Sequence, residues 1–127
     1  MDNKLVQEYL LSKPETTLDY PFGKEVKVFK VKNKMFATLS LGKMGKATDE
    51  NNFWWMNVKC DPDEALMLRD IFPSIIAGYH MNKRLWNTVI LDGSIPKGEI
   101  ERMIDNSFML VVNKMTKKDQ QSILLHL

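Results

Sequence analysis

The residue types that build common catalytic and metal sites are scarce in this chain. Among its 127 residues there are one cysteine, Cys60, and two histidines, His80 and His126. One cysteine cannot form a disulfide within the chain, and these three residues lack the close spacing of a zinc site. A nucleophile built from Cys60 and His80 would need an orienting acid such as Asp61, and a small buried role is the stronger interpretation of Cys60. We therefore expect no catalytic residue, no metal and no cofactor.

Two widespread catalytic and nucleotide-binding motifs are missing as well. No Gly-x-Ser-x-Gly sequence occurs, which removes the usual nucleophile elbow of a hydrolase. Residues 45–48 contain part of a phosphate-binding loop, but Ser40 stands where that loop requires glycine, and no serine or threonine directly follows Lys46. We expect a protein without enzymatic activity.

Long apolar runs are also missing. The longest, such as residues 110–112 and 123–125, fall far short of the roughly 20 residues that cross a bilayer. The first residues do not show the cationic start, apolar run and cleavage site of a signal peptide. We expect no membrane span, and together with the single cysteine this favours a cytoplasmic location.

The net charge of +2 is too small to indicate a nucleic-acid-binding protein by itself. Its distribution is more informative, because residues 24–59 contain eight lysines against three acidic residues, a local charge of +5, and the rest of the chain carries −3. A basic, strand-rich segment is one footprint of phosphate binding. Lysines that protect sheet edges from aggregation explain the same distribution equally well.

What the chain does contain predicts one globular α+β domain over residues 1–127. Hydrophobic residues make up 44% and charged residues 27%, values typical of a folded domain with a proper core. Helical periodicity and capping residues predict four helices, and the order of elements indicates an antiparallel sheet with helices packed on one face. The predicted helices begin at Asp2, at Asp61-Pro62, at Pro96 and at Thr116, and Pro14 ends the first of them.

Alternating and β-branched runs predict strands at residues 26–32, 35–41, 53–59 and 86–91, and the order of elements allows one or two strands after the second predicted helix. The first two are separated by the short turn Asn33-Lys34 and should pair antiparallel. Residues 16–23 are predicted as a connector and residues 42–52 as an exposed loop or wing. Three tryptophans and six phenylalanines exceed what a small core must hide, so we expect the second sheet face to be concave and to bind a partner through Trp54, Trp55 and Trp86.

The densest set of unusual side chains lies directly before the strand at 86–91. It supplies a titratable ring, an amide and two cations within five positions, groups that can hydrogen-bond an anion or a base edge, followed by an aromatic ring that can stack. The structural alternative is that the rings pack and the cations are solvated. The candidate binding residues are His80, Asn82, Lys83, Arg84 and Trp86, with Lys43 and Lys46 from the predicted wing.

Several short segments occur in one order along the chain: Pro21-Phe22-Gly23, residues 28–31 with 34–37, residues 58–62, residues 78–83 with 86–88, and residues 92–96. Together they resemble the MmcQ/YjbR family over nearly the whole chain. Phe108 departs from the pattern, because the family often has tyrosine there. The resemblance implies a fold like bacterial frataxin and like the double-wing DNA-binding domain of a phage transcription activator, and it brings no enzymatic activity.

Three functions follow as expectations. The first is a non-enzymatic DNA-binding protein that uses a basic, aromatic-bearing sheet face, a function implied by the resemblance through fold analogy. The alternative is a protein-interaction or small-ligand-binding module with no nucleic-acid role. Iron handling like that of frataxin comes last, because acidic residues are sparse in the first helix. In each case we expect a monomer or a weak homodimer.

Overall fold

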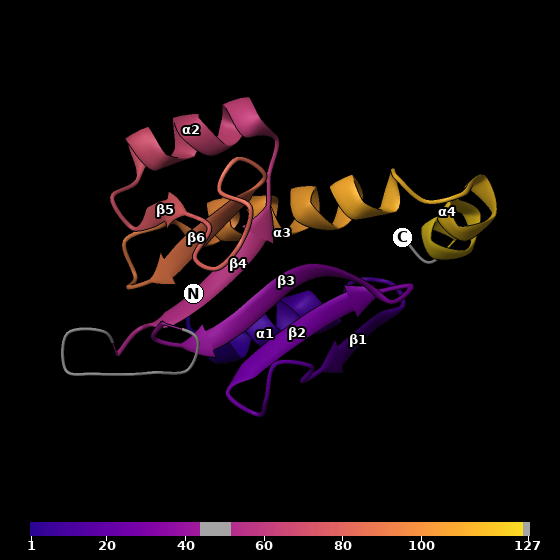
Figure 1. Cartoon of the computed structure of the whole chain (residues 1–127), viewed down its shortest axis with the longest axis horizontal. Coiled ribbons are helices and arrows are strands. Elements are labelled where there is room, and N and C mark those ends of the chain that lie inside the picture. The colour runs from indigo at the N-terminus through magenta and orange to yellow at the C-terminus, as the bar shows by residue number, and fades with distance from the viewer. Residues whose placement is uncertain (44–51, 126–127) are drawn as a thin grey trace.

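The fold is an α+β arrangement in which one antiparallel sheet is packed against helices (Figure 1). The computed structural model describes residues 1–43 and 52–125, and within them the sheet has six strands in the order β1-β2-β3-β4-β6-β5. The predicted fold class is confirmed. The elements are α1 (Asn3–Leu11), β1 (Thr16–Asp19), β2 (Val26–Val31), β3 (Lys34–Leu41), β4 (Trp54–Lys59), α2 (Pro62–Ile71), β5 (Ile75–Ala77), β6 (Trp86–Leu91), α3 (Lys97–Val112) and α4 (Lys117–Leu124).

Capping residues start three of the helices where the sequence predicts them. The Asp2 carboxylate accepts a hydrogen bond from the Leu5 amide at 2.9 Å, and Asp61 does the same for the first turn of α2, with Pro62 in the first helical position. Thr116 Oγ1 accepts from the Asp119 amide at 3.2 Å at the start of α4. Each cap satisfies amides that the helix itself leaves without partners, which fixes where the helix begins.

The core lies between the helices and one face of the sheet. A row of register partners on β3, β4, β6 and β5 supplies the sheet side, and α1, α2 and α3 each contribute buried apolar residues to the same cluster. Figure 1 shows α1 and α3 passing behind the strands, with α4 beyond the end of α3. The row is Leu39, Met56, Val89 and Ile75, and the helices add Val6, Leu10, Ala65, Leu68, Ile104 and Phe108.

The sequence missed the strand β1, allowed for a second strand beside β6 without locating β5, and misplaced one turn. β1 lies within the predicted connector and is held by pairing with β2, where Thr16 faces Val31. β5 has three residues and no pattern of its own, and it forms as the edge partner of β6. The β2–β3 turn is centred on Lys32 and Asn33, whose φ angles of 48° and 64° are those of a type I′ hairpin. Most of the predicted wing, including Lys46, lies outside the described residues.

The second face of the sheet differs from the predicted open aromatic surface. Its central row, Val28, Thr38, Asn57 and Thr88, is at most 5% exposed. Nor do the three tryptophans share this face, because strand alternation sends Trp54 to the helix side and Trp55 to the other. Lys27 Nζ lies 5.4 Å from the centre of the Trp54 ring on the helix side, whereas Trp55 and Trp86 are 8% and 9% exposed.

Candidate functional site

The turn before β6 uses most of its predicted binding groups to hold itself together. The Asn82 side-chain oxygen accepts hydrogen bonds from the amides of Arg84 at 2.9 Å and Leu85 at 3.2 Å. Lys83 Nζ donates to the Gly78 carbonyl at 3.0 Å. Asn82 and Lys83 therefore have structural partners inside the turn, and a ligand would have to compete with those hydrogen bonds.

The remaining candidates in this turn differ in their exposure. His80 is exposed with a φ of 56°, and its ring lies 4.2 Å from the ring of Tyr79, measured between centres. Trp86 is 9% exposed, so the predicted stacking role is not supported, because almost none of its ring remains for a base. Arg84 is exposed, and across residues 1–43 and 52–125 no hydrogen bond or ion pair engages its guanidinium.

Lys43 does not join this turn at its Trp86 end. It follows β3, and register pairs Leu41 with Trp54 and then Leu91 at that end of the sheet. Trp86 pairs with Lys59 at the opposite end. The structure therefore separates Lys43 from Trp86, and the predicted set is not one continuous site.

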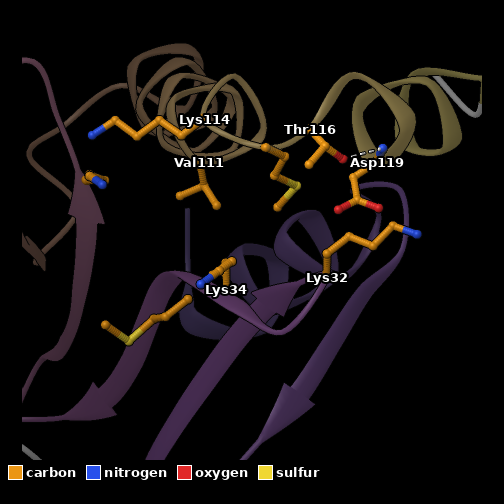
Figure 2. A pocket seen from close by; sticks show the side chains of 9 residues that line it. Lys32, Lys34, Val111, Lys114, Thr116 and Asp119 are labelled. Carbon is orange, nitrogen blue, oxygen red and sulfur yellow. Dashed lines mark hydrogen bonds between the residues drawn. The ribbon is translucent and has the colours of Figure 1, made fainter.

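A different cluster of cations surrounds a pocket of about 490 Å³ at the Lys59 end of the sheet (Figure 2). Its lining comes from the β2–β3 turn, the last residue of β4, the end of α3 and the first turn of α4. These segments are distant in sequence, and the fold alone brings them together. The lining residues are Lys32, Lys34, Met35, Lys59, Val111, Lys114, Met115, Thr116 and Asp119.

The four lysines of this pocket fall into two groups. Lys32 Nζ lies 3.1 Å from a carboxylate oxygen of Glu15 and 3.3 Å from the hydroxyl of Ser122, so its charge is compensated. Lys34, Lys59 and Lys114 form no ion pair with any carboxylate in the described part of the chain. Three of the four ammonium groups are therefore available to an anion.

Lys59 and Lys114 are close enough to affect one another. Burial lowers the pKa of Lys59, and the positive charge of Lys114 lowers it further. Two like charges in one pocket disfavour each other unless an anion lies between them. The pocket therefore has the electrostatic character of an anion site.

Buried contacts fix the backbone position of Lys59. The Ser107 hydroxyl of α3 accepts a hydrogen bond from the Lys59 amide at 2.8 Å and donates to the Phe36 carbonyl at 2.5 Å. Beside it, the rings of Phe36 and Phe108 meet edge to face with centres 5.3 Å apart. These contacts join the end of β4 to α3, so this wall of the pocket packs directly against the core.

Cys60 offers no nucleophile beside this pocket. It is 7% exposed, and burial raises its pKa to about 11, with further contributions from Glu64 and Asp61. The thiol therefore stays protonated near neutral pH, and the interpretation of Cys60 as a small buried residue is confirmed. In the parts of the chain that the structure covers, no three metal-binding side chains come together, and no helix there is long and apolar enough to cross a membrane.

Sequence reasoning found only part of this pocket. Lys34 and Lys59 belong to the lysine-rich segment, so the charge distribution contained a signal for them. Lys114 and Asp119 lie far along the chain and have no local pattern that marks them. Only the packing of α3 and α4 against the β2–β3 turn places them beside the other two.

Known proteins resemble this chain in both sequence and fold. The family model described as YjbR matches residues 11–110. The uncharacterized protein YbdF of Escherichia coli O157:H7 is 34% identical over 113 residues, covering 89% of this chain and 86% of the relative. The uncharacterized protein YyaQ of Bacillus subtilis is 40% identical over 55 residues, covering 43% of this chain and 46% of that protein.

Solved structures are similar to this chain as well. A crystal structure of a Deinococcus radiodurans protein matches with a TM-score of 0.82 at 30% identity, covering 96% of this chain and 87% of that one. A crystal structure from Pseudomonas syringae matches with a TM-score of 0.75 at 31% identity, covering 87% of this chain and 98% of the other. The similarity in fold thus covers most of the chain, whereas the family model ends at residue 110, before Lys114 and Asp119 of the pocket.

Proposed function

The chain belongs to the YjbR family, and from that premise we propose that it is a non-enzymatic domain that binds a small anionic ligand in the lysine-lined pocket. One observation carries the proposal. Lys59 and Lys114 share a pocket without a carboxylate partner for either in the described residues. An anion bound between them removes their mutual repulsion, and that electrostatic gain supplies the binding energy.

The size and lining of the pocket support a small molecule as the ligand. Pockets that bind small molecules typically have volumes of about 300–1,000 Å³ and combine apolar walls with a few polar groups. This pocket has about 490 Å³, and Met35, Val111 and Met115 form its apolar part. A phosphate-bearing compound matches both features, because several ammonium groups can bind its oxygens while the walls cover the rest of the molecule.

The test is a titration of the protein with inorganic phosphate and with adenosine monophosphate, followed by calorimetry and by amide chemical shifts. We expect binding that Lys114→Gln weakens about tenfold, since a charged contact of this kind is worth about 1.4 kcal/mol or more. Lys97→Gln is the matched control, because Lys97 begins the same helix that ends beside Lys114. Absence of binding to both compounds at millimolar concentration, or equal losses in the two variants, contradicts the proposal.

DNA binding is the second candidate, and the exposed guanidinium of Arg84 favours it. Arg84 lies in the same turn as the exposed His80, and an exposed guanidinium can contact a phosphate. Titrations of labelled duplex and single strands at two salt concentrations test this candidate, because binding through phosphates weakens steeply with salt. Arg84→Gln should weaken DNA binding and leave the pocket ligand unaffected, whereas no binding at either salt concentration removes this candidate.

The compartment proposed for this domain is the cytoplasm. Its cysteine is free and buried, so its fold does not depend on a disulfide. A reducing compartment suits such a protein, and phosphorylated metabolites and nucleic acids are both present there.

A further inference from the structure

The lysine-lined pocket has different chemistry on its two sides. Figure 2 shows Lys114 and Asp119 on opposite sides, with Val111 and Lys34 between them. Lys59 belongs to the Lys114 side, because the charge of Lys114 acts on it directly. A ligand that fills the pocket therefore meets Lys59 and Lys114 at one end and Lys34 in the middle, and at the other end it meets the Asp119 carboxylate beside the paired Lys32.

The carboxylate end is open to a hydrogen-bond donor. The cap of α4 uses the backbone amide of Asp119, which donates to Thr116 Oγ1, and no hydrogen bond from the described part of the chain reaches the Asp119 carboxylate. Within residues 1–43 and 52–125 the Asp119 carboxylate forms no ion pair, and the neighbouring Lys32 is already paired with Glu15. An ionised carboxylate only accepts hydrogen bonds, so it favours hydroxyl or amino groups and repels a second phosphate.

Apart from Lys34, the wall between the two ends is apolar and adaptable. Met35, Val111 and Met115 line the pocket, and their side chains carry no strong hydrogen-bonding group. Methionine sulfurs make favourable contacts with aromatic rings and fit irregular shapes. This wall suits a ring or a sugar carbon skeleton better than a chain of charged groups.

We propose that the pocket selects a ligand of the nucleoside monophosphate type, with its phosphate on Lys59 and Lys114 and its hydroxyl or amino groups on Asp119. Asp119 is then the residue that determines specificity. The inference rests on the proposed function, since it names the class of ligand for the same pocket. It predicts that compounds with negative charge along their whole length bind less well than compounds with charge at one end.

The experiment compares adenosine monophosphate with pyrophosphate in wild type and in Asp119→Asn. The asparagine has nearly the same shape and leaves the backbone cap of α4 in place, so the fold should persist, which thermal unfolding checks. We expect the variant to bind adenosine monophosphate about fivefold more weakly and pyrophosphate about threefold more tightly, because it loses both an acceptor charge and a repulsion. Asp70→Asn, on the exposed side of α2, is the control and should change neither affinity.

The outcomes separate the inference from the proposed function. If Lys114→Gln weakens binding of both compounds while Asp119→Asn changes neither, the pocket binds anions but Asp119 does not select among them, and the inference is overturned. If wild type binds neither compound, both proposals fall. If Asp119→Asn weakens both compounds equally, the carboxylate supports the pocket without discriminating, which also overturns the inference.

Discussion

Two cation-bearing regions of this molecule face ligands very differently. The turn at residues 78–86 has the most unusual local sequence, yet Asn82 and Lys83 spend their polar groups on amides and a carbonyl of the same turn. The lysine-lined pocket draws Lys34, Lys59 and Lys114 from segments far apart in sequence, and none of the three forms an ion pair among the described residues. The unusual residues of the turn therefore serve mainly its own backbone, whereas the lysines without ion pairs support the binding site that we propose.

Backbone geometry explains why the turn needs these residue types. His80 has a φ of 56°, a region that most side chains disfavour. Asn82 holds two consecutive amides, as asparagine often does in turns. Gly78 is buried where a side chain would collide with Trp86. The residue types of this turn are therefore explained by its backbone geometry, without reference to a ligand.

The largest predicted effect tests this structural role. A Cβ at Gly78 would lie 2.8 Å from the Cβ of Trp86 and 3.0 Å from the Trp86 carbonyl oxygen, and backbone atoms cannot move aside cheaply. We expect Gly78→Ala to lower the free energy of unfolding by about 3 kcal/mol, as measured by urea denaturation. An unchanged midpoint would show that the turn tolerates a side chain and would weaken the contrast between the two regions.

Gly98→Ala is the matched control for that measurement. Gly98 lies in the first turn of α3, and a Cβ there has no neighbouring atom within 4 Å. Alanine is the better helix former, so this variant should be up to about 1 kcal/mol more stable than wild type. Changes of opposite sign in the free energy of unfolding at the two glycines would separate steric collision from a general effect of replacing glycine by alanine.

The sequence predicted the fold well because its strongest signals are local. Caps at Asp2, Asp61 and Thr116 mark helix starts without help from the rest of the chain, and the structure confirms all three. The misses are elements that depend on their neighbours. β1 and β5 are too short to show a pattern, and pairing with β2 and β6 creates them.

The candidate site was less predictable for the same physical reason. Exposure and hydrogen-bond partners are tertiary properties, so the sequence could not tell the buried Trp86 from the exposed Arg84. Nor could it place Lys114 beside Lys59, because the two are brought together by a helix crossing a sheet. The sequence did contain the excess of lysine before residue 60, and this excess predicts the positive charge of one wall of the pocket.

The next effect concerns the support of the pocket. Ser107 is fully buried and links the Lys59 amide to the Phe36 carbonyl. Ser107→Ala deletes the hydroxyl that bonds both of these groups. We therefore expect a loss of about 2 kcal/mol in the free energy of unfolding together with weaker phosphate binding. Ser12→Ala deletes a hydroxyl that also donates to a carbonyl, but at an exposed position, and should cost less than about 0.5 kcal/mol. Equal losses would mean that burial does not decide the cost.

A smaller effect distinguishes the two neighbouring cations of the turn. Lys83→Met removes the hydrogen bond to the Gly78 carbonyl, and we expect it to cost about 1 kcal/mol of stability. Arg84→Gln should change stability by less than about 0.5 kcal/mol, because no partner within the described residues is lost. Thermal unfolding of both variants measures the difference. The reverse order would show that Arg84, and not Lys83, holds the turn.

The smallest effect probes the charge pair of the pocket. Burial is the larger cause of the lowered pKa of Lys59, and the charge of Lys114 is the smaller one. Lys114→Gln removes only the second cause, so the pKa of Lys59 should rise and still remain below its ordinary value. Titration of the side-chain carbon signals of lysine by NMR follows this change, and Lys97→Gln should leave the pKa of Lys59 where it was.

A bound phosphate should also raise the pKa of Lys59 in wild type, because an anion favours the charged amine. If neither Lys114→Gln nor phosphate moves it, Lys59 and Lys114 do not share one electrostatic site.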